Sequence, residues 1–226
     1  MTEPDVALTD FALALESGVF AAVLWRSRGL TGGRVPWLLL YFAMAGVASL
    51  CGGLVHGFFL DQNTMGNAIL WPTTLLAIGL NAVAAFVIGA QLLFLPSVVR
   101  IISIVAGLAF AAYAGVVLMG ADLFRAAVWM AAPATLFLFC ALLFEAWRGR
   151  RPGAIFAAAG LALTAAAILV QQRGIGIHPR YFNHNAAAHC VQAVALALFF
   201  AGSLRLLGRT STEPTERESC AHDANS

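Results

Sequence analysis

The sequence predicts an all-α polytopic membrane protein, a bundle of seven transmembrane helices, and three observations support this fold class. The chain is 61% hydrophobic and only 11% charged, whereas soluble domains carry about 25% charged residues. Apolar runs recur along the chain, and seven of them approach the roughly 20 residues that cross a bilayer core. The acidic start "MTEPDVALTD" lacks the basic region and cleavage site of a secretory signal peptide, so the first run is predicted to be a retained helix.

The boundaries of the seven spans follow from the apolar runs and from the residues that interrupt them. Pro96 favours a turn between the third and fourth runs, while Pro72 and Pro133 lie inside longer runs. The polar, small-residue-rich stretch 209–226 is predicted to be a disordered cytoplasmic tail, which leaves residues 1–208 as the membrane domain. The predicted spans are residues 9–25, 35–60, 67–95, 97–120, 122–147, 152–172 and 182–207.

The distribution of arginine predicts the orientation in the membrane. The 13 basic residues are all arginines, and most lie in the loops after the first, third and fifth spans or after the seventh. The opposite side carries only Arg125, Arg173 and Arg180. Because cytoplasmic loops are enriched in basic residues, we expect an extracytoplasmic N-terminus, a cytoplasmic C-terminus and a multi-pass location in the inner (plasma) membrane. The net charge of +2 gives no indication of nucleic-acid binding.

Histidine and carboxylate side chains gather at the predicted outer face. The second span runs outward and the seventh begins outside, so His56 lies near the same face as His184 and His189. Asp10 is placed at this level near the start of the first span, and Asp61 follows the second span. Ionisable groups within membrane spans are costly and mark functional sites. The sequence therefore predicts a polar site at this face.

Helical geometry sorts the polar residues that open the seventh span. At about 100° per residue, Asn185, His189 and Gln192 fall within roughly 60° of one another and form one polar stripe. His184 lies about 140° from His189, so it reaches the same site only if the helix begins irregularly. Asn183 is placed to cap this helix.

These residue types favour a metal site as the first interpretation. A catalytic zinc needs three protein ligands, commonly histidine with carboxylate, and an open position for water. His56 and His189 are the first two predicted ligands, with His184, Asp10 or Asp61 as the third. Asp10 or Asp61 would also serve as the general base. The alternatives are an interhelical hydrogen bond for His56, helix capping for Asp10 and simple solvation for Asp61.

A seven-helix chain with a histidine near the end of the second span, and a histidine motif opening the seventh, resembles the alkaline ceramidase and progestin/adipoQ receptor superfamily of membrane hydrolases. The resemblance implies zinc held by His56, His189 and a third histidine, assisted by an aspartate and a serine near the first ligand, with lipid amides as substrates. Asp61 and Ser49 are the nearest such residues here. The first histidine of the superfamily's HxxxH motif would fall at Asn185, so His184 stands one residue early.

Three stretches of sequence resemble a second family more closely. "LTD", "GGLVHGF" and "YFNHNAAAHCVQAVAL" are similar to segments of a family of bacterial seven-helix membrane proteins. This resemblance implies the seven-helix fold without implying an activity.

Three functional hypotheses follow. The first is a zinc-dependent hydrolase of a lipid, amide or small amphiphile, acting at the level of the outer leaflet. The second is a receptor, sensor or ligand-binding protein without metal, in which the polar cluster forms hydrogen bonds to its ligand. The third is a haem-binding redox protein with His56 and His189 as axial ligands.

Overall fold

The computed structural model describes residues 1–27, 33–120, 123–149, 153–178 and 181–207, and it consists of seven helices. Each helix is long and apolar enough to cross a membrane, so the predicted fold class is confirmed. In the described ranges the only β-type pairing is an isolated bridge between His178 and Phe182. The helices are α1 (Pro4–Ser27), α2 (Val35–Phe58), α3 (Met65–Leu93), α4 (Pro96–Leu118), α5 (Leu123–Trp147), α6 (Gly153–Gln172) and α7 (His184–Leu207).

Most helix boundaries lie within two residues of the predicted ones, but α1 differs. It begins at Pro4, five residues before the predicted start. Proline is favoured in the first turn, where its missing N–H costs no hydrogen bond, and Asp5 in the same turn complements the helix dipole. Residues 4–8, which precede the predicted first span, are therefore helical.

Some predictions fall outside the described residues. They concern the tail at residues 209–226, and Asp122 and Pro152, the predicted first residues of the fifth and sixth spans.

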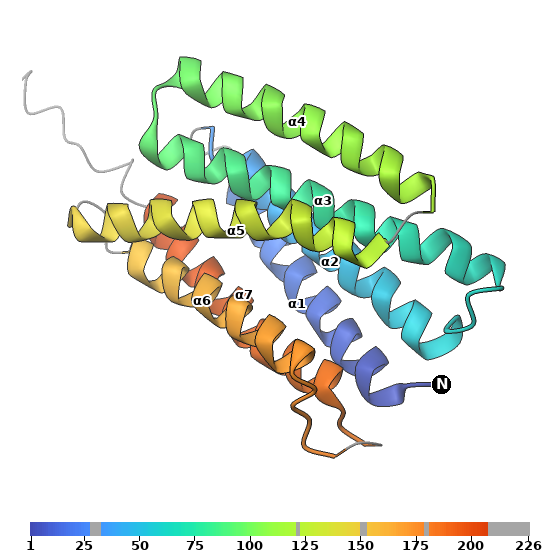
Figure 1. Cartoon of the computed structure of the whole chain (residues 1–226). Coiled ribbons are helices and arrows are strands. Elements are labelled where there is room, and N and C mark those ends of the chain that lie inside the picture. The colour runs from blue at the N-terminus through green and yellow to red at the C-terminus, as the bar shows by residue number, and fades with distance from the viewer. Residues whose placement is uncertain (28–32, 121–122, 150–152, 179–180, 208–226) are drawn as a thin grey trace, which may run out of the picture.

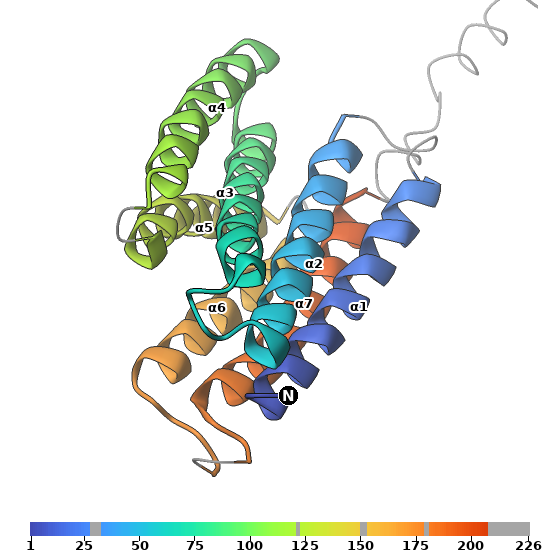
Figure 2. The same cartoon turned by 90° about the vertical axis from the view of Figure 1, so that its right-hand side faces the viewer.

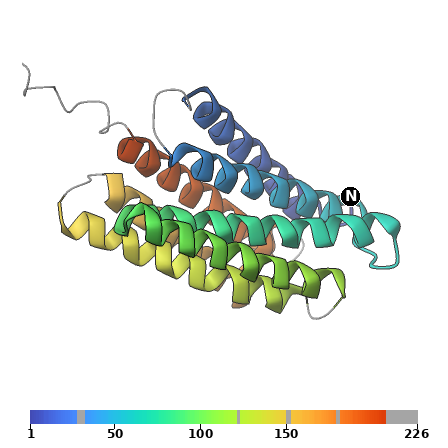
Figure 3. The same cartoon turned by 90° about the horizontal axis from the view of Figure 1, so that it is seen from above.

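Six helices form a closed ring, and α4 lies outside it. Around the ring, α1 packs on α2, α2 on α3, α3 on α5, α5 on α6, α6 on α7, and α7 on α1, while α4 packs on α3 and α5. Figures 1 and 2 show α3, α4 and α5 as one group beside α1, α2 and α7. Seen from above, α3 lies between the α1–α2 pair and α5 (Figure 3). Three residues of the predicted polar site, Asp10, His56 and His189, lie on the α1–α2–α7 group, one on each helix.

Glycines allow α1 and α2 to approach closely. A Cβ at Gly53 would come within 2.9 Å of the Phe11 ring and 3.0 Å of the Asp10 Cβ, and one at Gly57 would contact Ala7 at 3.3 Å. In a bilayer the hydrophobic effect does not drive helices together, so such close backbone packing is a main source of helix–helix attraction. The small-residue run of α2 thus fixes α1 against it.

An aromatic cluster fills the interior of the same three helices. Phe20 of α1 stacks on Phe200 of α7 with ring centroids 4.2 Å apart, and meets Phe42 of α2 edge-on at 5.5 Å. Phe42 and Phe199 are fully or almost fully buried. Aromatic pairs in these geometries add about 0.5–1.5 kcal/mol beyond the area they bury. This cluster holds α1 and α7 in parallel register below the polar site.

The two ends of the bundle differ in their side chains. The histidine end comprises the starts of α1, α3, α5 and α7 with the ends of the other helices, and it carries His56, His184 and His189. The opposite end, here called the arginine end, carries five of the described arginines and the exposed indoles of Trp25 and Trp147. The described arginines there are Arg26, Arg34, Arg100, Arg148 and Arg205.

Candidate functional site

The first histidine of the site, His56, lies in the last turn of α2 and pairs with the N-terminal residues of the chain. Its Nδ1 lies 2.6 Å from Oε2 of Glu3, a short contact between the imidazole and the carboxylate. The backbone joins the same two segments, since the Glu3 N–H donates to the His56 carbonyl at 3.2 Å and the Thr2 N–H to that of Gly57 at 3.0 Å. The residues preceding α1 are thereby fastened to the end of α2.

The second histidine, His189, lies one turn into α7 and faces α1. Its Nδ1 lies 3.0 Å from Oγ1 of Thr9, and its Nε2 lies 3.5 Å from Oδ1 of Asp10. Both imidazoles thus lie against the first residues of the chain, His56 at Glu3 and His189 at Thr9 and Asp10. Asp10 and His189 therefore form the centre of the site, with His56 beside them.

The carbonyl oxygens around Thr9 favour one tautomer of His189. The Thr9 hydroxyl lies 2.9 Å from the carbonyl oxygens of both Asp5 and Val6, and it has one hydrogen to donate. We assign that hydrogen to the helix backbone, and in the resulting tautomer the hydroxyl accepts from Nδ1–H of His189. In the neutral ring Nε2 then has a lone pair, and it faces a carboxylate oxygen of Asp10. The contact is attractive only when one proton lies on Nε2 or on the carboxyl group.

The carboxyl group of Asp10 is deeply buried, with only 6% of the residue exposed. Two glycines of α2 provide the space for it: a Cβ at Gly52 would lie 3.2 Å from Oδ2 of Asp10, and Gly53 borders the Asp10 Cβ. Burial of an ionisable group is costly unless it is paired or neutral. The glycines of "CGGLVHG" thus admit a carboxyl group to the position that faces His189.

The start of α7 is fixed by a cap that also reaches α1. Oδ1 of Asn183 accepts from the backbone N–H groups of Asn185 and Ala186 at 2.9 and 3.1 Å, which confirms the predicted cap. The Asn183 N–H donates to Oδ2 of Asp5 at 2.9 Å. The first turns of α1 and α7 are therefore tied together between the His189–Asp10 contact and the ends of the two helices.

The polar stripe predicted on α7 contacts two neighbouring helices, α6 and α1. Asn185 accepts a hydrogen bond from Gln171 at 3.1 Å, and Gln192 donates to Thr164 at 3.2 Å, both on α6. His189 instead faces α1. This division agrees with the helical angles, since Asn185 and Gln192 are displaced by about 40° and 60° from His189 in the same rotational sense.

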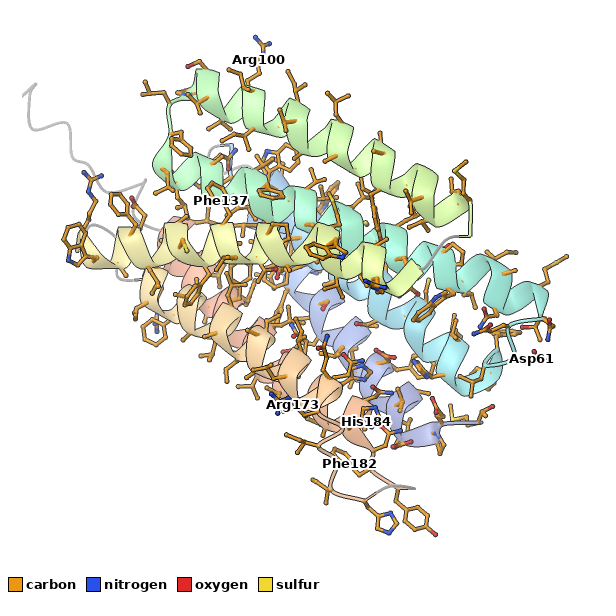
Figure 4. The ribbon with its side chains drawn as sticks, viewed as in Figure 1. Asp61, Arg100, Phe137, Arg173, Phe182 and His184 are labelled. Carbon is orange, nitrogen blue, oxygen red and sulfur yellow. The ribbon has the colours of Figure 1, made fainter. Side chains whose placement is uncertain are left out.

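Three of the predicted site residues have different surroundings. Asp61 is exposed and accepts from the backbone and side chain of Asn63, at 2.9 and 3.1 Å, within its own turn, and Figure 4 shows it at the loop after α2, well away from His184. Ser49 is half-buried about two turns from His56 along α2. His184 is half-buried at the first position of α7. Across the described residues, no hydrogen bond joins Ser49, Asp61 or His184 to the His189–Asp10 pair.

The fit of the site to a zinc ion was tested against the side chains present. Within the described ranges, no group of three or more His, Cys, Asp or Glu side chains is arranged to hold a metal ion. Asp10 and His189 meet as a pair, and Nδ1 of His56 is occupied by Glu3. The described side chains therefore give no support for the three-ligand zinc site, which stays a prediction.

Glu3 and Thr9 contact the two imidazoles but were not among the predicted site residues. Both residues were placed outside the first span or at its edge, because the apolar run begins near Thr9. Proline at position 4 followed by an acidic residue is a helix-start signal, and it would have extended α1 to include this segment. Glu3 directly precedes the first residue of that helix, Pro4, and Asp10 follows less than two turns into it.

Comparison with known proteins identifies the family. A model described as a family of unknown function, DUF6962, matches residues 6–207, which is almost the whole membrane domain. The chain belongs to the DUF6962 family. No curated protein and no solved structure matches the chain. The matched range contains Thr9, Asp10, His56 and His189, so the DUF6962 match covers all of the polar site except Glu3 and Asp5.

Proposed function

We propose that this protein is a membrane sensor, without enzymatic activity, whose input is protonation of the site formed by Glu3, Thr9, Asp10, His56 and His189. The main observation in support is that His189 directs Nδ1 to Thr9 and Nε2 to Asp10. That geometry requires a shared proton for an attractive contact. Imidazole is the side chain whose ordinary titration range spans about pH 5 to 8. The arginine distribution supports an orientation in which this end faces outward.

The output of the sensor would be a change in how α1 is held. With the proton bound, Asp10 and His189 attract and hold α1 to α7, while Glu3 and His56 hold the N-terminal residues to α2. Without the proton, a lone pair of Nε2 faces the Asp10 carboxylate at 3.5 Å, and the contact becomes repulsive. The titratable groups that face His189 are Asp10 and His56, and those that face His56 are Glu3 and His189. Loss of the proton is thus expected to release α1 from α7 at the histidine end.

Spin labels on α1 and α7 test the proposal. Leu8 is 59% exposed and Cys190 is exposed, so we would label Leu8→Cys and the native Cys190 in a background that lacks Cys51, Cys140 and Cys220. We expect the interlabel distance to increase as the pH is raised and the shared proton is lost. In Asp10→Asn the amide group can donate to a bare Nε2 or accept from Nε2–H, so the distance should stay at its low-pH value.

The matched control for this experiment is Asp61→Asn. It neutralises an exposed carboxylate at the same end of the bundle, and the pH response should persist. A distance that is constant with pH in the wild type, or a response that is unchanged in Asp10→Asn, would refute the sensor.

A divalent metal site remains the second candidate, and one observation favours it. In both histidines Nδ1 contacts a side-chain oxygen near the start of the chain. Nδ1 of His56 contacts Glu3, and Nδ1 of His189 contacts Thr9. Metal-ligating histidines characteristically hold one ring nitrogen in this way and bind metal with the other. Metal analysis of the purified protein separates the two candidates. Near-stoichiometric zinc that is lost in His189→Ala would support a zinc-dependent hydrolase, whereas the sensor predicts no bound metal.

A further inference from the structure

The structure contains a cavity at the arginine end, remote from the histidine site. Its volume is about 400 Å³, and it lies where the start of α2, the end of α3, the start of α4 and the end of α7 meet. The lining residues are Gly33, Arg34, Gln91, Phe94, Pro96, Val99 and Leu207. Arg34 is the only charged residue among them.

We propose that this cavity binds the headgroup of an anionic phospholipid that carries hydroxyl groups. The level of the cavity in the bilayer supports a lipid. Arg34 directly precedes α2, less than one turn from Trp37, and the end of α1 nearby carries the exposed indole of Trp25. Tryptophans concentrate at the headgroup level of membranes. A ligand at this depth would come from the leaflet that surrounds the protein.

The charge at this end favours an anion. Five arginines and one carboxylate, the buried Glu145 (4% exposed), lie at the described part of the arginine end. Arg34 donates from Nη2 to the backbone carbonyl of Gln91 at 3.3 Å, which orients the guanidinium at the cavity. A guanidinium has five N–H donors, so it can bind a phosphate while it keeps its protein contacts. Basic pockets between membrane helices are a recognised mode of binding anionic headgroups.

Gln91 supplies the second element of recognition. Its Nε2 donates to the Gly33 carbonyl at 3.2 Å, and its Oε1 is buried without a hydrogen-bond partner in the part of the chain that the structure describes. A buried acceptor without a partner costs about 1–3 kcal/mol. A hydroxyl on the headgroup would satisfy it. Phe94, 45% exposed, and Val99 give the cavity an apolar border along which an acyl chain can lie.

Thermal unfolding of the full chain in a neutral detergent, with native mass spectrometry to count bound lipid, tests this proposal. We expect phosphatidylglycerol to raise the melting temperature of the wild type and to remain bound, while phosphatidylcholine and inorganic phosphate do neither. Arg34→Gln should weaken phosphatidylglycerol binding by about tenfold or more, as expected for loss of a charged hydrogen-bond donor. Arg100→Gln is the matched control, because Arg100 is exposed at the same end and does not line the cavity.

A second variant makes the test independent of the stability of Arg34→Gln. Val99→Trp fills the cavity without altering any charge, and it should also abolish the lipid effect. Equal stabilisation by phosphatidylcholine or by free phosphate would overturn the proposal. So would an effect that is lost to the same extent in Arg100→Gln as in Arg34→Gln, or one that survives in Val99→Trp.

Discussion

Gly202→Val is expected to separate α6 from α7 and to lower the free energy of unfolding by about 3 kcal/mol or more, because the new side chain has no space. A Cβ at Gly202 would lie 2.4 Å from the backbone nitrogen of Ala157 and 2.7 Å from the carbonyl oxygen of Gly153. Overpacking against movable side chains costs typically 1–3 kcal/mol, and here the neighbours are backbone atoms. Reversible unfolding in detergent or by steric trapping in bilayers measures the change.

The matched control for Gly202→Val is Gly115→Val on α4. A Cβ at Gly115 meets nothing within 4 Å, so this variant should unfold within about 0.5 kcal/mol of the wild type, as surface substitutions do. Equal destabilisation by the two substitutions would show that the loss of glycine itself, rather than the α6–α7 contact, determines the effect.

His189→Ala is expected to destabilise the α1–α7 contact by about 2 kcal/mol. This is the typical cost of losing a hydrogen bond to a charged group and leaving its buried partner unpaired. It removes the contacts at 3.0 Å to Thr9 and at 3.5 Å to Asp10 and leaves Asp10 buried. A double-mutant cycle with Asp10→Ala isolates the coupling between the two side chains. The coupling should be favourable by about 1 kcal/mol or more.

His184→Ala serves as the control for this cycle. His184 is half-buried in the same first turns of α7, and in the described part of the chain it makes no hydrogen bond to α1. Its removal should cost less than about 0.5 kcal/mol, and its coupling to Asp10 should be close to zero. A coupling to Asp10 as large as that of His189 would contradict the assignment of His189 as the partner.

The fold was predictable because its main signal is local. Each membrane span corresponds to one apolar run, so seven helices and most of their ends follow from hydrophobicity and length alone. The one large error, at the start of α1, arose where the helix continues beyond the apolar run through Pro4 and Asp5. Hydrophobicity marks the part of a helix in the bilayer core, whereas capping and turn residues mark where the helix begins.

The site was predictable only in part, because its contacts join residues far apart in the chain. Topology correctly placed His56 and His189 at one end of the bundle, and helical angles separated His184 from His189. The partners could not be derived in this way: the Glu3–His56 contact spans 53 positions and the Thr9–His189 contact 180. Which face of α7 meets α1 depends on how six helices close into a ring, and no local periodicity encodes that closure.

The sensor proposal rests on the identity of the groups that share a proton, and ¹⁵N NMR of histidine-labelled protein in nanodiscs measures this most directly. We predict that Asp10→Asn shifts the imidazole resonances of His189, that Glu3→Gln shifts those of His56, and that Asp61→Asn leaves both sets unchanged. The contradicting result is two imidazoles that titrate as freely solvated side chains and respond to neither of the first two substitutions.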